Sequence, residues 1–196
     1  MHQSAVALDS QPVLDVQTIR DRARRQIQNG AVTPNYGLDR DVVLRLLNEA
    51  LATEIVAVLS YKRQYFAAKS SGLPNLVATL KEHASHDQEH ADRLAERIAQ
   101  LGGLPNFSPV GLAQRSHAEY CEGGRLAEIV RDALVMERVA VESYREMIRF
   151  IGDGDPTTRR LLEDLLAVQE QHARNLLSLV EEVSLTEASR AVRSLS

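Results

Sequence analysis

Apolar residues recur every three or four positions along four long stretches of this chain. That period places them on one face of an α-helix, where they can pack against a common core. The stretches are residues 39–70, 74–101, 124–151 and 156–183. None of them alternates apolar and polar residues with a period of two, so no strand is expected. The pattern predicts an all-α fold, an antiparallel four-helix bundle.

Residues that start and stop helices separate the four stretches. Asp39 can cap the first helix, and Pro74, shortly after Gly72, can open the second. Residues 152–155 make a short turn, whereas the connection 102–122 is too long for one. A long connection can carry the chain back along the bundle, so we expect a crossover between the second and third helices.

The predicted bundle, residues 39–184, leaves a segment at each end. Residues 1–38 are expected to form a loose arm with a short helix from Val13 to Asn29, and residues 185–196 a tail with room for another short helix. The N-terminal helix carries four arginines, but Asp15 and Asp21 dilute its positive charge. We therefore expect a solvated helix face there rather than a DNA-binding surface.

The composition is that of a soluble globular protein, with 44% hydrophobic and 26% charged residues. The sequence shows neither a leader pattern nor an apolar run long enough for a membrane span, so a cytoplasmic protein without a membrane partner is expected. A net charge of −4 gives no support to a nucleic-acid partner. Cys121 is the only cysteine, which excludes an intrachain disulfide and a thiolate cluster within one chain.

Polar side chains interrupt each of the four apolar faces near its middle. They are Glu54 on the first helix, Asp87 and His90 on the second, Glu137 on the third, and Gln169 and His172 on the fourth. A charged carboxylate in an apolar seam is costly unless it is paired or binds a metal. Residues three apart project to the same side of a helix, so all six can face one cavity. They are our candidate metal ligands and catalytic residues.

A repeat links the two halves of the chain. Residues 54–61 and 137–144 share Glu, Val, Ala, Val, Ser and Tyr at matching positions, and a carboxyl- or amide-x-x-His motif follows each copy at nearly the same distance. One Glu and one such motif from each helix pair is the ligand plan of a di-iron carboxylate bundle. Carboxylate and imidazole ligands suit Fe(II) and Mn(II), and zinc less selectively.

Four further side chains lie close to this plan. Tyr61 and Tyr144 follow the two Glu residues on the same helix faces, and either core packing or a supporting, electron-donating role fits them. We include Tyr61 among the candidate catalytic residues. His83 lies on the apolar face and can bond a ligand carboxylate, whereas His86 fits a rim position equally well.

The repeat and motifs, with the stretches 90–93 (HADR) and 101–106 (LGGLPN), resemble the bacterioferritin and ferritin-like family. The similarity is greatest to the bacterioferritin-type members of the cage group that includes DNA-binding proteins from starved cells, and it runs from about residue 39 to residue 183. It implies a ferritin-like bundle. It also implies that Glu54 and His90 are terminal ligands of one iron, and Glu137 and His172 of the other.

The same resemblance puts Asp87 and Gln169 in the two bridging-carboxylate places, where family members usually have Glu. Asp87 keeps the charge on a shorter side chain. Gln169 has one neutral acceptor oxygen and cannot bridge two cations as a carboxylate does, so the second metal should bind more weakly. Bacterioferritins carry a haem-ligand Met where this chain has Gln88, so haem is not expected.

The resemblance implies a ferroxidase that oxidises Fe(II) with O2 or H2O2 at an intra-subunit di-iron site and stores or detoxifies iron in a hollow homo-oligomeric shell. The short tail favours a shell of twelve subunits over one of twenty-four. Gln169 leaves open whether the enzymatic activity survives. Two alternatives remain: a di-metal oxidase without a mineral store, and a structural or DNA-protecting shell whose ferroxidase site has degraded.

Overall fold

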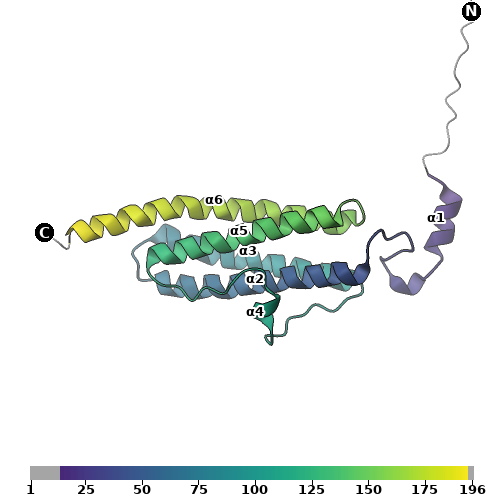
Figure 1. Cartoon of the computed structure of the whole chain (residues 1–196), viewed down its shortest axis with the longest axis horizontal. Coiled ribbons are helices and arrows are strands. Elements are labelled where there is room, and N and C mark those ends of the chain that lie inside the picture. The colour runs from purple at the N-terminus through teal and green to yellow at the C-terminus, as the bar shows by residue number, and fades with distance from the viewer. Residues whose placement is uncertain (1–13, 194–196) are drawn as a thin grey trace, which may run out of the picture. The chain divides into compact units, whose positions relative to one another are not determined.

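The computed structural model describes the backbone of residues 14–193 and the side chains of residues 14–185. Four long helices form a bundle (Figure 1): α2 (Arg40–Ala68), α3 (Pro74–Gln100), α5 (Leu126–Ile151) and α6 (Pro156–Arg193). Residues 14–193 contain no strand. The predicted all-α four-helix bundle is therefore confirmed. None of the helices in this part of the chain combines the length and apolarity needed to cross a lipid bilayer.

The bundle is made of two antiparallel helix pairs. α2 packs most extensively on α3, and α5 on α6. Figure 1 shows that α3 ends and α5 begins at opposite ends of the bundle, so residues 102–125 must run the full length of it. This is the crossover that the sequence predicts. It contains one short helix, α4 (Leu112–Arg115), which the sequence pattern did not indicate.

Three polar side chains of α2 hold the crossover in place. Asn48 Oδ1 accepts a hydrogen bond from the backbone N–H of residue 106 at 2.8 Å, and Thr53 Oγ1 one from residue 117 at 2.9 Å. Ser60 Oγ accepts a third from residue 121 at 3.2 Å. These bonds satisfy backbone groups that would otherwise lack partners beside an apolar helix pair. They also fix the outer face of α2, whose inner face carries Glu54.

The helix ends follow from local chemistry. Asp39 caps α2 by accepting from the N–H groups of Asp41 and Val42 at 2.9 and 3.3 Å. Asp155 caps α6 through Thr158 N at 2.9 Å, and Arg97 of α3 donates to both Asp155 oxygens at 2.9 Å. This buried ion pair joins the end of α3 to the start of α6 and so sets the relative height of the two helices.

Two regions differ from the sequence-based expectation. The predicted N-terminal helix is wrong in its extent: α1 covers only Val16–Ala23, and a 3₁₀ turn, η1 (Ile27–Asn29), follows after Gln26 adopts φ 52°. α1 buries no residue, and a short helix without packing has little to sustain it. Val13 lies outside the described residues. The N-terminal segment up to Tyr36 and the bundle from Gly37 onward are separate compact units.

The second difference is at the C-terminal end, where α6 continues through residues 185–193 instead of giving way to a tail. The printed sequence has neither Gly nor Pro between Val183 and Arg193, so nothing in it stops the helix. Val183 is the last buried residue of the described side chains. The apolar pattern of the sequence ends at Val183, ten residues before the helix does.

Candidate metal centre

The six candidate ligands are buried and lie together inside the bundle. α2 contributes Glu54, α3 contributes Asp87 and His90, α5 contributes Glu137, and α6 contributes Gln169 and His172. Each of them is at most 3% exposed. Successive turns of α3 and of α6 aim two side chains each at the same interior point, as the i, i+3 spacing predicts. The structure thus brings together every side chain that the sequence singled out as a ligand.

These residues form two groups of possible ligand atoms. In the first group, Glu54, Asp87 and His90 each place one ligand atom within 4.8 Å of the others. His90 Nδ1 lies 3.4 Å from Glu54 Oε2. In the second group, Glu137 and His172 are joined by His83, and His172 Nδ1 lies 3.2 Å from Glu137 Oε1. Each group is therefore compact enough to surround one cation.

Asp87 lies between the two groups. Its Oδ1 is 3.9 Å from His90 Nδ1 and 3.8 Å from His172 Nδ1, so one oxygen is nearly equidistant from both imidazoles. Its other oxygen, Oδ2, is buried without a hydrogen-bond partner among the described residues. This is the placement expected of a carboxylate that bridges two cations, and the shorter Asp side chain reaches it.

The hydrogen bonds of Gln169 within the described residues all go to the first group, Glu54, Asp87 and His90. Its Nε2 donates to Glu54 Oε1 and Oε2 at 3.1 and 3.2 Å and to Asp87 Oδ1 at 3.3 Å. Its Oε1 is buried and has no hydrogen-bond partner among the described residues. The amide N–H groups thus take the place of a positive charge beside two carboxylates. To serve as a ligand, Gln169 must rotate its amide so that Oε1 faces the cation.

Each of the two repeat halves supplies a tyrosine that forms a hydrogen bond with the glutamate of the other half. Tyr61 of α2 donates a hydrogen bond to Glu137 of α5, and Tyr144 of α5 donates to Glu54 of α2 at 2.5 Å. Both tyrosines are at most 2% exposed. Burial raises the pKa of each phenol well above its ordinary value, and the adjacent carboxylates raise it further. Both phenols therefore keep their protons and act as donors that orient the two glutamates.

The buried carboxylates respond differently to their surroundings. Burial, with the charges of Glu137 and Glu54, raises the pKa of Asp87 well above its ordinary value. Burial also opposes the charged form of Glu137, but hydrogen bonds from His172, His83 and Tyr61 outweigh it and lower the pKa. Of these two groups, Asp87 is thus the one whose negative charge the metal-free protein stabilises less.

This donor set fits a pair of divalent cations. Three carboxylates are buried together, and none of their ion pairs within the described residues involves a lysine or an arginine. Buried charge requires compensation, and hard oxygen ligands combined with imidazole supply a suitable site for Fe(II) or Mn(II). At this centre Asp87 Oδ2, Gln169 Oε1 and His83 Nε2 are buried without a hydrogen-bond partner among the described residues, and the two oxygens are acceptors that such ions can use.

Two further histidines lie beside the six candidate ligands, and the sequence pattern indicated no firm role for either. The ring of His83 stacks on that of His172 with centroids 3.7 Å apart, and its Nδ1 lies 3.3 Å from the Tyr61 hydroxyl. His86 Nδ1 lies 3.0 Å from His172 Nε2. The position of His83 on the apolar face signalled burial. No periodic signal marked His86, because it is half-buried at the edge of the bundle.

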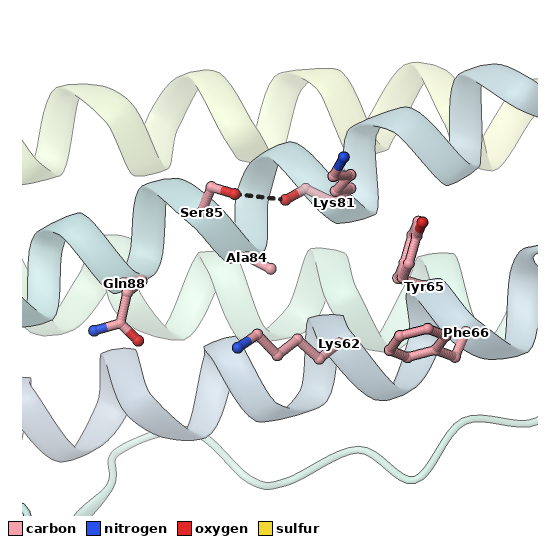
Figure 2. A pocket seen from close by; sticks show the side chains of 7 residues that line it. All are labelled: Lys62, Tyr65, Phe66, Lys81, Ala84, Ser85 and Gln88. Carbon is pink, nitrogen blue, oxygen red and sulfur yellow. Dashed lines mark hydrogen bonds between the residues drawn. The ribbon is translucent and has the colours of Figure 1, made fainter.

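A groove of about 550 Å³ on the outer side of α2 and α3 is separate from this centre. Figure 2 shows the lining side chains: Lys62, Tyr65 and Phe66 come from α2, and Lys81, Ala84, Ser85 and Gln88 come from α3. None of the six candidate ligands lines it. Gln88 occupies the position at which a bacterioferritin haem ligand is expected, and neither Met nor His is among the lining residues. That no haem binds stays a prediction.

A family model described as "Ferritin-like domain" matches residues 44–186 of the chain. The chain belongs to the ferritin-like family. This match covers most of the chain and includes all six candidate ligands.

Two relatives and one solved structure illustrate the similarity. A bacterioferritin of Brucella melitensis is 32% identical over 132 residues, which are 66% of this chain and 77% of the relative. A nutrient stress-induced DNA-binding protein of a Synechococcus species is 27% identical over 161 residues, 79% of this chain and 92% of the relative. The bacterioferritin-related dodecameric thioferritin of Bacteroides fragilis superposes with a TM-score of 0.73 at 24% identity, covering 78% of this chain and 92% of that one.

These relatives confirm the resemblance to bacterioferritins and starvation proteins that the sequence motifs indicate. The structural likeness is at low identity and speaks for the fold alone. The assignment of individual ligands therefore depends on the geometry of this chain, in which four helices meet at one buried cluster.

Proposed function

We propose that this protein oxidises Fe(II) at a di-iron site within each subunit and stores or detoxifies iron in an oligomeric shell. The observation that carries the proposal is the position of Asp87 Oδ1, 3.9 Å from one ligand imidazole and 3.8 Å from the other. A carboxylate oxygen between two sets of ligands is what a pair of neighbouring cations requires. The family's iron-binding members support iron as the substrate.

In this proposal the protein residues hold and orient the substrate ions. Glu54 and His90 bind one Fe(II), Glu137 and His172 bind the other, and Asp87 contacts both. The hydroxyls of Tyr61 and Tyr144 keep the two glutamates turned toward the centre. Gln169 presents its amide oxygen only after rotation, so the ion at Glu54 and His90 should be held more weakly. Mn(II) and Zn(II) fit the same ligands and can compete for them.

The proposed reaction balances with either oxidant. Two Fe(II) ions lose one electron each, and those two electrons reduce H2O2 with two protons to two molecules of water. With O2 as oxidant, the same two electrons and two protons give H2O2. In both cases the paired ions supply two electrons together, and with H2O2 this avoids the one-electron reduction that releases hydroxyl radical. The protein contributes position and charge, and iron contributes the redox chemistry.

Aerobic titration of the metal-free protein with Fe(II) tests this function. We expect oxidation that saturates at about two Fe(II) per subunit in its fast phase, because the site holds two ions. Glu54→Ala and Glu137→Ala should each abolish the fast phase, whereas Glu142→Ala, an exposed acid on α5, should leave it intact. Slow oxidation at the rate of the buffer alone, without saturation, would contradict the proposal.

A shell with a degraded ferroxidase site is the second candidate, and Gln169 is the observation that favours it. Its amide donates to Glu54 and Asp87 and so occupies the place of a cation. In that case the chain would assemble into a shell but show no saturable Fe(II) oxidation. Size-exclusion chromatography beside the titration separates these candidates from a di-metal oxidase, which would elute as a monomer or dimer.

We favour a shell of twelve subunits. In the described residues α6 runs unbroken to Arg193, so there is no separate fifth bundle helix up to that point. The relative from Bacteroides fragilis is named as dodecameric. With a subunit of 21.8 kDa, sedimentation or light scattering should give the mass of twelve chains. A mass of twenty-four chains would contradict the assignment of subunit number without affecting the iron chemistry.

A further inference from the structure

His86 forms a hydrogen bond with the outer nitrogen of a candidate iron ligand. Its Nδ1 lies 3.0 Å from His172 Nε2, the ring planes differ by 10° and the centroids are 5.2 Å apart. Two nearly coplanar rings that meet edge to edge have the geometry of a linear N–H···N bond. His172 therefore turns its other nitrogen, Nδ1, toward Glu137 at 3.2 Å and Asp87 at 3.8 Å.

The other candidate histidine ligand, His90, has no imidazole bonded to its outer nitrogen within the described part of the chain. In the repeat, the position of α6 that corresponds to His86 of α3 is Val168, which cannot form a hydrogen bond. Val168, His86 and His90 line one cavity of about 200 Å³ at the edge of the centre. The two halves thus differ at this position: among the described residues, His172 has an imidazole at its outer nitrogen and His90 has none.

The bond also constrains where the protons lie. Without a metal, His172 Nδ1 faces the Glu137 carboxylate and is best protonated, so that Nε2 accepts a hydrogen bond from the N–H at His86 Nδ1. A cation needs the lone pair of Nδ1, and a neutral His172 must then carry its proton on Nε2. Nε2 becomes the donor, and His86 Nδ1 must become the acceptor.

We propose that His86 is a positioning residue that fixes His172 as an Nδ1 ligand and exchanges tautomers with it when a cation binds. This inference rests on the proposed metal centre. The protons balance: one leaves Nδ1 of His172, one passes from Nδ1 of His86 to Nε2 of His172, and one is taken from water at Nε2 of His86. Both rings stay neutral. The half-buried position of His86 beside the cavity gives its Nε2 access to water.

Partners of this kind orient a ligand and raise its basicity, and losing one typically costs about 10- to 100-fold in metal affinity. The cation position at Glu137 and His172 should therefore fill first. The position at Glu54 and His90 lacks the partner and also faces the Gln169 amide. The pair of sites is thus inequivalent in spite of the repeat.

Nitrogen-15 spectra of the assembled protein, labelled at histidine, test the tautomer exchange directly. Zn(II) is the probe, because it is diamagnetic and redox-inert and accepts the same ligands. We expect the proton of His172 on Nδ1 without metal. With zinc we expect Nδ1 to be metal-bound and the protons of both His172 and His86 to lie on Nε2. Zinc bound through Nε2 of His172 would overturn the inference.

Calorimetric zinc titrations of variants test the consequence for affinity. His86→Leu should weaken the tighter binding step by about tenfold, and His86→Gln should recover it to within about threefold, because an amide can both donate and accept. His117→Gln, which removes a half-buried imidazole of the crossover beside Glu49, is the matched control and should change nothing. Thermal unfolding and chromatography verify that each variant folds and assembles.

The outcomes separate this inference from the proposed function. If the wild-type protein binds zinc and His86→Leu keeps its affinity, the role of His86 is refuted and the metal centre stands. If the wild-type protein binds neither zinc nor Fe(II), the metal centre itself is refuted, and the role of His86 with it.

Discussion

Tyr144 donates a hydrogen bond to Glu54 across 90 positions of the chain, with 2.5 Å between the hydroxyl and Oε1. Tyr61 makes the corresponding bond to Glu137. Each tyrosine thus serves the glutamate of the opposite helix pair, although each follows a glutamate of its own helix on the same face. The two halves of the repeat are therefore joined at the centre by reciprocal bonds, and each half helps to orient the glutamate of the other.

Tyr144→Phe tests this dependence. Removing a buried donor to a carboxylate should destabilise the metal-free protein by about 2 kcal/mol, because Glu54 loses one of its few compensating bonds. A cation at Glu54 would replace that bond, so the loss should shrink when Mn(II) is added. Thermal unfolding with and without Mn(II) measures both effects. Tyr120→Phe, at an exposed tyrosine of the crossover, is the control and should be neutral in both conditions.

Gln169→Glu should have opposite effects on the metal-free and metal-bound protein. A fourth buried carboxylate replaces three amide bonds to Glu54 and Asp87, so the metal-free form should lose about 2 to 4 kcal/mol of stability at neutral pH. The added charge should raise affinity for the second cation on the order of tenfold or more. Unfolding in chelator measures the loss of stability, and calorimetric metal titration measures the gain in affinity.

The control for this variant is Gln171→Glu, which adds the same charge on the exposed face of α6. It should alter neither stability nor metal stoichiometry appreciably. If Gln169→Glu leaves stoichiometry, affinity and oxidation rate unchanged, position 169 is not a ligand position, and the charge argument for a weak second site fails.

The bundle could be predicted from the sequence because a helix face that packs into the core needs an apolar residue every three or four positions, and this spacing is visible in the chain. Four apolar faces with polar residues at matching depth predict both the helices and the convergence of Glu54, Asp87 and Glu137. Local chemistry also fixes the ends: the side chain of Asp39 caps α2, and Pro74 opens α3. These features depend on neighbours along one helix, which a sequence displays directly.

Other features depend on contacts between distant segments and could not be predicted. Which glutamate accepts the hydrogen bond of each tyrosine depends on how the two helix pairs face each other. Knowing that a tyrosine lies on the inner face of its helix does not identify that glutamate. The role of His86 depends on which ring nitrogen meets His172, and a half-buried residue leaves no periodic trace. The bonds from Asn48 and Thr53 to the crossover required knowing where that loop runs.

Arg97→Met should destabilise the protein far more than loss of a surface ion pair would. Arg97 donates to both oxygens of buried Asp155, and side-chain exposures of 9% and 4% leave the pair little contact with water. Removing one partner of such a pair typically costs about 3 to 5 kcal/mol. Arg93→Met breaks the exposed pair with Asp164 and should cost less than about 1 kcal/mol. Chemical denaturation of both variants gives the comparison.

Asp87→Asn should change how stability depends on pH. In the folded metal-free protein the pKa of Asp87 is raised well above its ordinary value of 3.8, first by burial and then by the charges of Glu137 and Glu54. A group with a raised pKa contributes stability that is fully present below its unfolded pKa and is lost as the pH rises through its folded pKa. In the metal-free wild type, the contribution of Asp87 to the free energy of unfolding should therefore decrease as the pH rises from acid to neutral. Asp87→Asn should remove this decrease.

Denaturant unfolding in chelator, from mildly acidic to neutral pH, measures the difference between the two proteins. We expect Asp87→Asn to be the more stable one at neutral pH, with an advantage that shrinks as the pH falls, while it binds metal weakly because the bridging oxygen charge is gone. Asp92→Asn, at an exposed acid five residues along α3, should show no such trend. If Asp87→Asn is instead less stable at neutral pH without metal, a hydrogen-bonding role of the Asp87 carboxylate outweighs its cost of burial, and cations are not needed to explain why the bundle tolerates it.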